Sequence, residues 1–329
     1  MKIIITGGAG FIGSHITEYL SSINKIKKIV VLDNLKDGSK KNLKKALKSK
    51  KVQLFRADIR NYENIENYFK NTATVIHLAA LSDIVPSIEE PRDYIETNFN
   101  GTLNILEAMR KYNVKRIIYA ASSSCYGITK KTPTDEKDKI NPMYPYAFSK
   151  YVGEELIKHY SKVYKLDYIS LRLFNVYGTR SRTNSAYGAA LGVFLKQKLE
   201  NKPFTIVGNG KQKRDFIHVS DVCNVFAKAI FSKHKNDIFN IGNGLPKSVN
   251  EMVRLIGGKK SFIPKRPGEP SITHANITKV KLKLNWEPKK SFKDGINDVL
   301  KNIDYWKNSI LWNKSNIKKV TKNWFKYLK

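Results

Sequence analysis

Short apolar runs alternate with longer stretches of helical apolar spacing up to about residue 178. The runs lie at 2–6, 28–32, 52–55, 74–78, 116–120 and 168–173. A chain that alternates strands with helices builds a parallel sheet, because each helix carries the chain back to the end where the next strand starts. Helices then cover both faces of the sheet, so its strands are apolar at nearly every position. The pattern predicts an α/β fold with a doubly wound parallel sheet.

The pattern is less regular after residue 178. Loops with glycine and proline, such as "VGNGKQ" and "PKRPGEP", separate helices that we expect near 186–200, 218–232 and 247–256. We therefore expect one unit over 1–178 and a smaller C-terminal lobe, mainly over 179–329, that supplies a ligand site. The chain is expected to cross between the two lobes.

The segment "SNIKKVTKNWFKYLK" (315–329) is expected to be an amphipathic helix capped by Ser315. Its apolar residues recur at helical spacing, and lysines fill the other face. They are Ile317, Val320, Trp324, Phe325 and Leu328. We expect the helix to dock on its own subunit or on a partner subunit, with a membrane surface as the alternative.

The net charge of +32 comes mainly from lysines that are scattered along the whole chain. A nucleic-acid binder concentrates its charge on one element, so a solvated surface that attracts an anionic substrate is the better interpretation. No apolar run approaches the ~20 residues of a membrane span. Cys125 and Cys223 have no metal or redox spacing. We expect a cytoplasmic protein with no metal site and no specific nucleic-acid partner.

The glycine-rich stretch "TGGAGFIGSH" follows the first predicted strand and opens a helix. Gly7, Gly10 and Gly13 would allow a tight turn, close approach of the backbone to a pyrophosphate, and close packing of the helix on the strand. Asp33 ends the second strand, twenty residues beyond Gly13. A carboxylate there accepts hydrogen bonds from a ribose diol and repels a 2′-phosphate, which favours NAD over NADP. The stretch "ADI" (57–59) is expected to contact the adenine.

Tyr146 and Lys150 are four residues apart, so they share one face of a helix. A nearby ammonium stabilises a phenolate, so the pair can act as a general base near neutral pH. Ser122, Ser123 and Ser124 lie just upstream, at the end of the fifth strand.

The chain resembles the extended short-chain dehydrogenases/reductases, in particular the nucleotide-sugar epimerases and dehydratases. The matching stretches are "TGGAGFIGSH", "LDN", "ADIR", "HLAA", "NFNGTLNILEA", "ASSSCYG", "YPYAFSK", "RLFNVYG", "RDFIHVSDV" and "KLNWEP". The resemblance implies a Rossmann lobe that holds NAD and a C-terminal lobe that binds a nucleoside diphosphate sugar. It also implies that Ser122 hydrogen-bonds the sugar hydroxyl that is oxidised, so the catalytic set is Ser122, Tyr146 and Lys150.

The resemblance also implies two sets of binding residues. The set for NAD is Gly7, Gly10, Phe11, Ile12, Gly13, Asp33, Asn34, Asp58, Ile59, Ala79, Asn98, Tyr146 and Lys150. The set for the substrate is Ser82, Ser122, Ser123, Ser124, Asn175, Asn184, Arg214, Arg266, Glu269 and Thr273. The arginines suit a diphosphate because they form forked, charge-assisted hydrogen bonds.

The serines after the fifth strand help to distinguish between the reactions of the resembled family. The 4,6-dehydratases of the resembled family carry an Asp-Glu pair where this chain has Ser123 and Ser124. A hydroxyl is too weak a base to remove a carbon-bound proton unaided, which leaves oxidation and re-reduction at C4. We expect a UDP-hexose 4-epimerase. The enzyme alternatives are a dehydratase, a reductase or a UDP-glucuronate 4-epimerase, the last because Arg180 and Arg182 lie in the loop 179–188. A Rossmann-fold sensor or nucleic-acid binder is the alternative without catalysis.

The resemblance carries three further expectations. Thr273 lies where a bulky residue excludes N-acetylated sugars, so this small side chain should admit them. Helices near 94–112 and 145–163 should pair with their copies as a four-helix bundle in a homodimer. Asn276 and Asn285 replace the family's Asp and Gly, and we expect Asn285 to tolerate a left-handed conformation.

Other polar residues are expected to be structural. Asp215 and Asp221 should order the segment "RDFIHVSDV". His77 and His218 have no metal-ligand partner at useful spacing, so we expect them to be satisfied within the fold.

Overall fold

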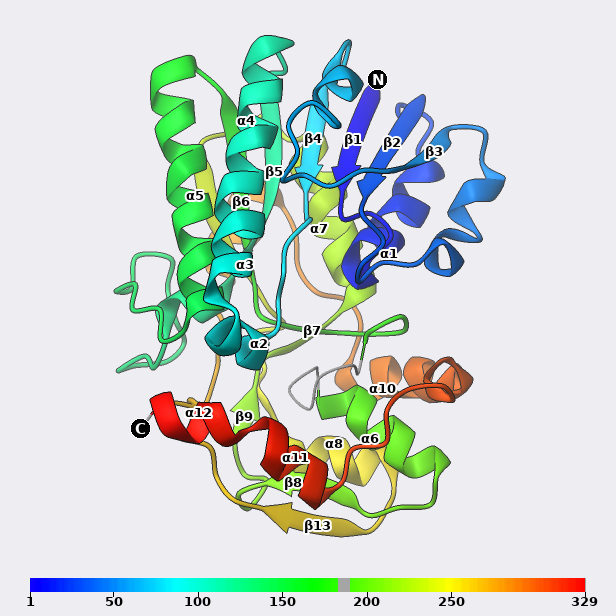
Figure 1. The fold of residues 1–329 in the computed structure, drawn as a ribbon, viewed down its shortest axis with the longest axis vertical. Coiled ribbons are helices and arrows are strands. Elements are labelled where there is room, and N and C mark those ends of the chain that lie inside the picture. Colours follow the sequence, from blue (N-terminus) through cyan, green and yellow to red (C-terminus); the bar gives the residue numbers. More distant parts are fainter. Residues whose placement is uncertain (183–189, 329) are drawn as a thin grey trace.

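The computed structural model describes residues 1–182 and 190–328 and has two lobes, shown in Figure 1. The larger lobe is built on a seven-stranded sheet of order β3-β2-β1-β4-β5-β6-β11, with every neighbouring pair parallel. Its strands are β1 (Lys2–Thr6), β2 (Lys28–Asp33), β3 (Val52–Arg56), β4 (Thr74–His77), β5 (Arg116–Ser122), β6 (Asp167–Leu173) and β11 (Asp237–Ile241). The six strands expected from the apolar runs and the α/β class are confirmed.

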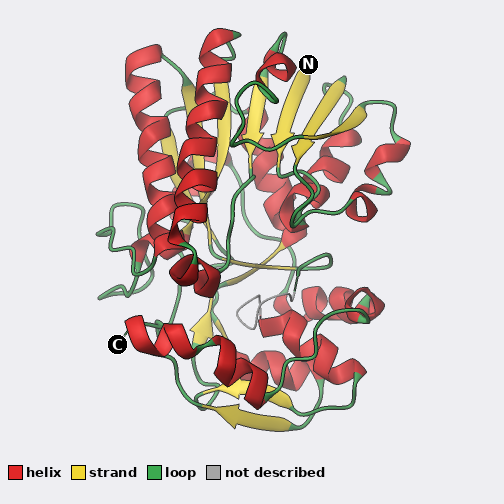
Figure 2. Cartoon of the chain, in the orientation of Figure 1, coloured by secondary structure: helices red, strands yellow, loops and turns green. Residues whose placement is uncertain are grey.

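Helices cover both faces of the sheet (Figure 2). In β1, Ile3 and Ile5 point to the face covered by α1 (Phe11–Ser21) and α7 (Val219–Phe231). Ile4 points to the opposite face, covered by α4 (Gly101–Lys111) and α5 (Pro145–Tyr164). All three isoleucines are fully buried, so both halves of the strand's alternation are apolar.

Strand β11 was not expected from the sequence. It pairs with β6 after the chain has passed through the smaller lobe, so residues beyond 178 complete the edge of the sheet. Its run "DIFNI" is short, and the polar Asn240 interrupts it although that side chain is completely buried. A five-residue run whose first and fourth residues are polar gives only a weak strand signal.

The smaller lobe has its own apolar core. It is built mainly from α6 (Ala190–Leu199), β8 (Phe204–Val207), α8 (Val249–Ile256), β13 (Lys260–Ile263) and α10 (Phe292–Lys301). The helix expected near 186–200 is described from Ala190 onward, because 183–189 lie outside the described residues.

Shorter elements complete the two lobes. The remaining strands are β7 (Asn175–Tyr177) with β10 (Phe216–His218), and β9 (Lys213–Arg214) with β12 (Lys247–Ser248). The remaining helices are α2 (Ile84–Glu89), α3 (Pro91–Ile95), α9 (Thr278–Leu284), α11 (Lys314–Val320) and α12 (Lys322–Tyr327). A π-helical turn spans Glu96–Asn100, and 3₁₀ turns span Lys40–Leu43, Ala46–Lys48, Glu66–Phe69, Ser123–Tyr126 and Ile303–Trp306.

Of the helices that the structure describes, none combines the length and the apolar character that a membrane crossing needs.

The segment expected as one helix from a Ser315 cap forms two helices, α11 and α12. The cap is Asn313, whose side chain accepts from the Asn316 N–H at 3.0 Å, while the Asn316 side chain accepts from the Asn313 N–H at 2.7 Å. This reciprocal pair satisfies two backbone donors, so it fixes the start two residues earlier than expected. Thr321 separates the two helices.

The C-terminal helices pack on their own chain. In α11, Ile317 joins a small apolar cluster with Val193 and Ile263 of the smaller lobe. In α12, the Trp324 indole donates to the Pro267 carbonyl at 2.7 Å. Figure 1 shows this segment, in red, running across the front of the smaller lobe to a position near α2. The expected docking within one subunit is confirmed for this segment.

Helices α4 and α5, expected to form a dimer interface, lie side by side on one face of the sheet (Figure 1). On α5, Phe148, Val163 and Tyr164 are exposed. The homodimer itself stays a prediction.

A buried ion pair fixes α5 on the sheet. Glu154 of α5 and Arg172 of β6 are almost fully buried and paired, with the Arg172 Nε 3.2 Å from both Glu154 oxygens. The Ser170 hydroxyl donates to Glu154 at 2.6 Å, and Arg172 also donates to the Tyr126 hydroxyl at 2.8 Å. Tyr126 in turn donates to Asn240 of β11 at 2.7 Å. The network joins α5, β6, β11 and the turn after β5.

We predict that Glu154→Gln lowers the free energy of unfolding by about 3–5 kcal/mol, because it leaves the Arg172 cation buried without its counter-charge. Urea denaturation followed by tryptophan fluorescence measures the change. The control is Glu155→Gln, since the neighbouring Glu155 is 40% exposed and pairs with Lys158 on the surface. It should cost about 0.5 kcal/mol or less. Equal effects of the two variants would contradict the structural weight given to the buried pair.

Candidate active site

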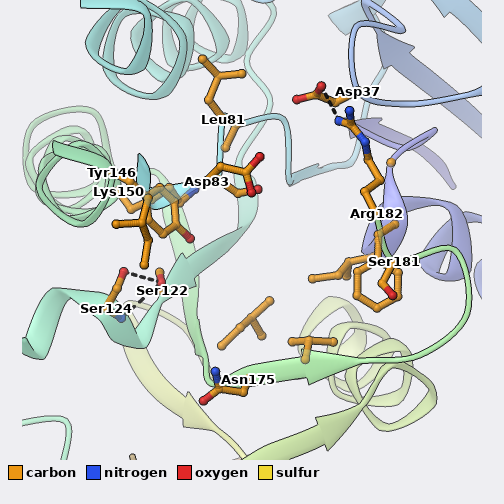
Figure 3. Close-up of a pocket in the computed structure, with 18 of the residues that line it drawn as sticks. Asp37, Leu81, Asp83, Ser122, Ser124, Tyr146, Lys150, Asn175, Ser181 and Arg182 are labelled. Atoms are coloured by element: carbon orange, nitrogen blue, oxygen red, sulfur yellow. Dashed lines mark hydrogen bonds and ion pairs between the residues drawn. The ribbon is translucent and has the colours of Figure 1, made fainter. Parts of the chain in front are cut away.

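A cavity of about 650 Å³ lies between the two lobes, where the strands of the large sheet end. Ligands bind to open α/β sheets at the carboxyl ends of the strands, because the loops there converge. Figure 3 shows side chains that meet in it from both sides. Most of the residues expected to bind cofactor or substrate line this cavity.

The expected residues divide into those that line the cavity and those that do not. Lining it are Gly7, Gly10, Phe11, Ile12, Asp33, Asn34, Asp58, Ile59, Ala79, Ser82, Ser122, Ser123, Ser124, Tyr146, Lys150, Asn175, Arg214, Arg266, Glu269 and Thr273. Gly13 and Asn98 are described but are not among its lining residues. Asn184 lies outside the described residues.

The glycine-rich turn leaves no room for side chains. Gly7 has a φ of +68°, and a Cβ there would lie 2.7 Å from the Ala79 backbone nitrogen. A Cβ on Gly13 would lie 2.1 Å from the Gly7 carbonyl oxygen, so Gly13 acts beneath the turn by allowing close packing. Helix α1 starts after Gly10, and the first N–H groups of a helix have no partner within it. The turn therefore fits the pyrophosphate of the expected NAD.

The end of β2 presents a carboxylate held by the backbone. The Asp33 oxygens accept from the N–H groups of Ala9 and Leu35, both at 2.9 Å. Burial raises the pKa of Asp33, while these two hydrogen bonds lower it. Asp58 accepts from Asn34 at 3.0 Å, and its hydrogen bonds with Arg60 hold the pKa of Asp58 below its ordinary value. These residues fit the ribose and adenine ends of NAD.

Asn98 has a positioning role. Its amide accepts from the Leu81 N–H at 2.8 Å and donates to the Leu81 carbonyl at 2.9 Å and to the Ser149 hydroxyl at 2.9 Å. The side chain is 1% exposed. Asn98 therefore fixes the loop after β4 against α5, and its expected contact with the cofactor stays a prediction.

The serine cluster meets the tyrosine at the end of β5. The Ser122 and Ser124 hydroxyl oxygens are 2.7 Å apart, and the Ser122 oxygen accepts from the Ser124 N–H at 3.2 Å. Burial raises the pKa of Tyr146, whereas hydrogen bonds with Ser122 and Ser124 lower it. Since the hydroxyls of the serines and of Tyr146 share one network, a sugar hydroxyl that enters it can pass its proton to Tyr146.

Lys150 is buried beside this cluster. Its ammonium lies 4.1 Å from the centre of the Tyr119 ring, and the residue is 5% exposed. Burial lowers the pKa of Lys150 to about 7, and the charge of Glu154 opposes this shift. Lys150 therefore exchanges a proton near neutral pH, in the range where the Tyr146 base must work.

The smaller lobe contributes a second cluster of polar side chains to the cavity. Arg214 donates to Glu269 at 2.7 Å, and Thr273 donates to the Asn175 side chain at 2.9 Å. The Arg266 guanidinium lies 5.9 Å from the centre of the Trp324 ring. The two arginines thus line one cavity, as binding of a diphosphate requires.

Several lining residues were not expected from the sequence. Asp83, Tyr144 and Trp324 line the cavity, and Tyr144 stacks on Tyr146 with ring centres 6.3 Å apart. Trp324 lies 6.4 Å from Tyr144 and comes from α12. The sequence predicts Trp324 only as one apolar residue of the C-terminal helix, and Asp83 lies outside the matching stretches.

The arginines of the loop after β7 are engaged with the large lobe. Arg180 pairs with Glu18, and Arg182 pairs with Asp37. Figure 3 shows Arg182 and Asp37 across the cavity from Tyr146 and Lys150. Neither pairing supports the expectation that these arginines hold a carboxylated sugar.

Residues expected to be structural have structural partners. Asp215 accepts from the N–H groups of Asn243 and Ala275, and Asp221 from those of Lys289 and Lys290. His77 lies between the hydroxyls of Thr6 and Thr102, and the His218 side chain caps α7. Asn285 has a φ of +47°, as expected for a replacement of glycine. Among residues 1–182 and 190–328, no group of three or more potential metal ligands is found.

Comparison with known proteins gives consistent matches. Residues 3–242 match the model of the NAD dependent epimerase/dehydratase family. The chain is 39% identical over 315 residues to a Methanocaldococcus jannaschii protein to which UDP-glucose 4-epimerase activity is ascribed, covering 93% of this chain and 99% of the relative. It is 33% identical to a UDP-glucuronate 4-epimerase of Thermodesulfobacterium geofontis, covering 96% and 97%. The UDP-N-acetylglucosamine 4-epimerase of Methanobrevibacter ruminantium, solved with UDP-N-acetylmuramic acid, superposes with a TM-score of 0.86 at 30% identity, covering 91% and 97%.

The buried Lys150 predicts a pH dependence of stability. Its pKa is about 7 in the folded chain and 10.5 in the reference state. Between these values the unfolded chain holds a proton that the folded chain has released, so stability rises with pH. Lys150→Met should therefore raise the free energy of unfolding most at and below pH ~7. Its stability advantage over the wild type should shrink as the pH rises toward the pKa of the lysine in the unfolded chain.

Urea denaturation of nucleotide-free protein across this pH range tests the prediction. Lys158→Met is the matched control, because Lys158 lies on the same helix and pairs with Glu155 at the surface. The control should show no such convergence with the wild type. A difference between Lys150→Met and the wild type that stays constant with pH would contradict the buried ammonium.

Proposed function

Because this chain belongs to the NAD-dependent epimerase/dehydratase family, we propose that it is a nucleotide-sugar 4-epimerase that interconverts UDP-hexoses. The family match makes it an NAD-dependent enzyme. The observation that carries the proposal is the hydroxyl network of Ser122, Ser124 and Tyr146 at the end of β5. The two residues after Ser122 supply hydroxyls where dehydration needs an acid and a base.

In this proposal the chain's own residues move one proton. Ser122 hydrogen-bonds the sugar O4, and Tyr146 accepts the O4 proton, which returns when the carbonyl is reduced again. Lys150 supplies the nearby positive charge that favours the Tyr146 phenolate. Bound NAD, held by the glycine-rich turn and Asp33, supplies the hydride acceptor and donor for the sugar carbon. Arg214 and Arg266 bind the diphosphate, so the sugar can turn between the two hydride transfers.

Tyr146→Phe should abolish turnover, a loss of at least about a thousandfold, because it deletes only the proton acceptor. The fold and the bound NAD should be retained, which circular dichroism and nucleotide release on denaturation measure. Products from UDP-Glc, UDP-GlcNAc and UDP-GlcA are separated by chromatography, and their masses are measured by mass spectrometry. A product lighter by one water would identify a dehydratase instead, and turnover by Tyr146→Phe would overturn the assignment of the base.

We further propose that the sugar site admits N-acetylated hexoses. Thr273 lines the cavity and its hydroxyl is fixed on Asn175, so the wall there is small and rigid. Thr273→Tyr should lower kcat/KM for UDP-GlcNAc by about a hundredfold and that for UDP-Glc by much less, because the ring would occupy the space of the acetamido group. Thr273→Ser is the control, because it keeps the hydroxyl and adds no bulk. Equal losses on both sugars, or no turnover of UDP-GlcNAc by the wild type, would refute the proposal.

A further inference from the structure

Helix α12, near the C-terminus, brings an aromatic ring into the candidate substrate cavity. Trp324 lies on this helix and lines the cavity together with Arg266. Trp324 is 3% exposed, whereas the next residue, Phe325, is 38% exposed. The fold therefore separates two rings of one helix, because one reaches the cavity and the other stays at the surface.

Helix α12 contacts both lobes. On the side of the larger lobe, the Asn323 side chain donates to Glu89 of α2 at 3.2 Å. On the side of the smaller lobe, the Trp324 indole donates to the Pro267 carbonyl at 2.7 Å. Figure 1 shows α12, in red, beside α2. The helix thus joins the two lobes next to the cavity that lies between them.

The loop that carries Arg266 is supported by two different elements. Its later part, residues 271–273, pairs with β9, where the Lys213 N–H donates to the Ser271 carbonyl at 2.9 Å and the Thr273 N–H donates to the Lys213 carbonyl at 3.1 Å. Its earlier part, with Arg266 and Pro267, is contacted by α12. The sheet therefore fixes one half of the loop, and α12 helps to fix the half that carries the arginine.

The Trp324 ring can orient Arg266 without occupying its hydrogen-bond donors. The guanidinium lies over the ring, 5.9 Å from its centre. An aromatic face attracts a cation, tryptophan most strongly, and the attraction is larger where water is excluded. The N–H donors of a guanidinium lie at the edge of its plane, so contact with a ring face leaves them to bind a phosphate.

We propose that Trp324 is a positioning residue for the diphosphate of the substrate, because its indole holds the loop through Pro267 and keeps the Arg266 guanidinium at the cavity before the nucleotide arrives. This inference rests on the proposed function, in which Arg266 binds the diphosphate, and it adds α12 to the parts that determine affinity. A group that is ordered before binding loses less conformational entropy on binding, so the affinity is higher. Loss of the ring should therefore weaken nucleotide binding and leave the chemical step almost unchanged.

Calorimetry with UDP as the probe tests the inference in the NAD-loaded wild type and in matched variants. Trp324→Leu keeps apolar bulk but removes the aromatic face, and it should raise the Kd for UDP by about tenfold. Trp324→Phe keeps a ring but loses the hydrogen bond to Pro267, so it should recover part of the affinity. Phe325→Leu makes the same ring deletion outside the cavity and should change the Kd by less than about twofold. Equal losses in Trp324→Leu and Phe325→Leu would refute the inference.

A double-mutant cycle with Arg266 separates positioning from general packing. Arg266→Ala by itself should raise the Kd for UDP. In that background Trp324→Leu should have little further effect, because the group that the ring positions is gone. Additive losses would mean that Trp324 acts independently of Arg266, contrary to the proposal.

Kinetics with UDP-Glc give a readout that a change in the catalytic end would move differently. Trp324→Leu should raise KM by about tenfold while kcat changes by less than about threefold, since uniform binding alone is lost. Trp324 also lies 6.4 Å from Tyr144, which stacks on the proposed base Tyr146. A fall in kcat as large as the rise in KM would place the effect of Trp324 at this ring pair, and the inference would be wrong.

The outcomes distinguish this inference from the function on which it rests. If the wild type binds UDP but epimerises no UDP-hexose, the proposed function fails, and the Kd values for UDP still decide the role of Trp324. If Arg266→Ala weakens UDP binding and Trp324→Leu does not, the proposed function stands and only the inference fails. An unchanged Kd in Arg266→Ala, or a wild type that binds no UDP, would overturn the inference together with the proposed binding of the diphosphate.

Discussion

The buried pair of Glu154 and Arg172 is the interaction on which the geometry of the site depends. Glu154 lies one helical turn beyond Lys150, and Arg172 reaches Tyr126 in the turn that begins with the serines. A charge pair removed from water is stable only when its remaining hydrogen bonds are satisfied, and here Ser170 and Tyr126 satisfy them. The helix that carries Tyr146 and the turn that carries the serines are therefore both held by the buried Arg172 side chain. A shift of either would break the network.

Charge is distributed unevenly around the cavity. At the cofactor end, Asp33 and Asp58 are held by backbone and side-chain donors, so their carboxylates are fixed before any ligand binds. At the nucleotide end, Arg214 is already paired with Glu269. The large positive net charge of the chain thus draws an anionic ligand toward the molecule, while the paired groups inside decide which anion fits. The lysines on the surface need no role in recognition.

The local parts of the fold could be predicted, and the parts that depend on distant contacts could not. Apolar runs and the glycine turn are read from neighbouring residues, so the six strands and the turn that opens α1 were predicted correctly. Strand β11 was missed because Asn240 is polar, and its burial is explained by hydrogen bonds with the distant Tyr126 and Thr134. Asp83 was missed because it lies outside the matching stretches, and its place at the cavity is defined by the fold. The cap at Ser315 was wrong because a better reciprocal pair begins at Asn313.

The place of β11 in the sheet has a consequence for the synthesis of the chain. Strand β6 is complete at Leu173, but its outer neighbour begins only at Asp237. A ribosome makes about 5–20 residues per second, so for several seconds the nascent sheet has a bare edge of unpaired N–H and carbonyl groups. Bare edges pair with strands of other chains, so during this interval the seven-residue β6, instead of the five-residue β11, is the edge strand open to such pairing.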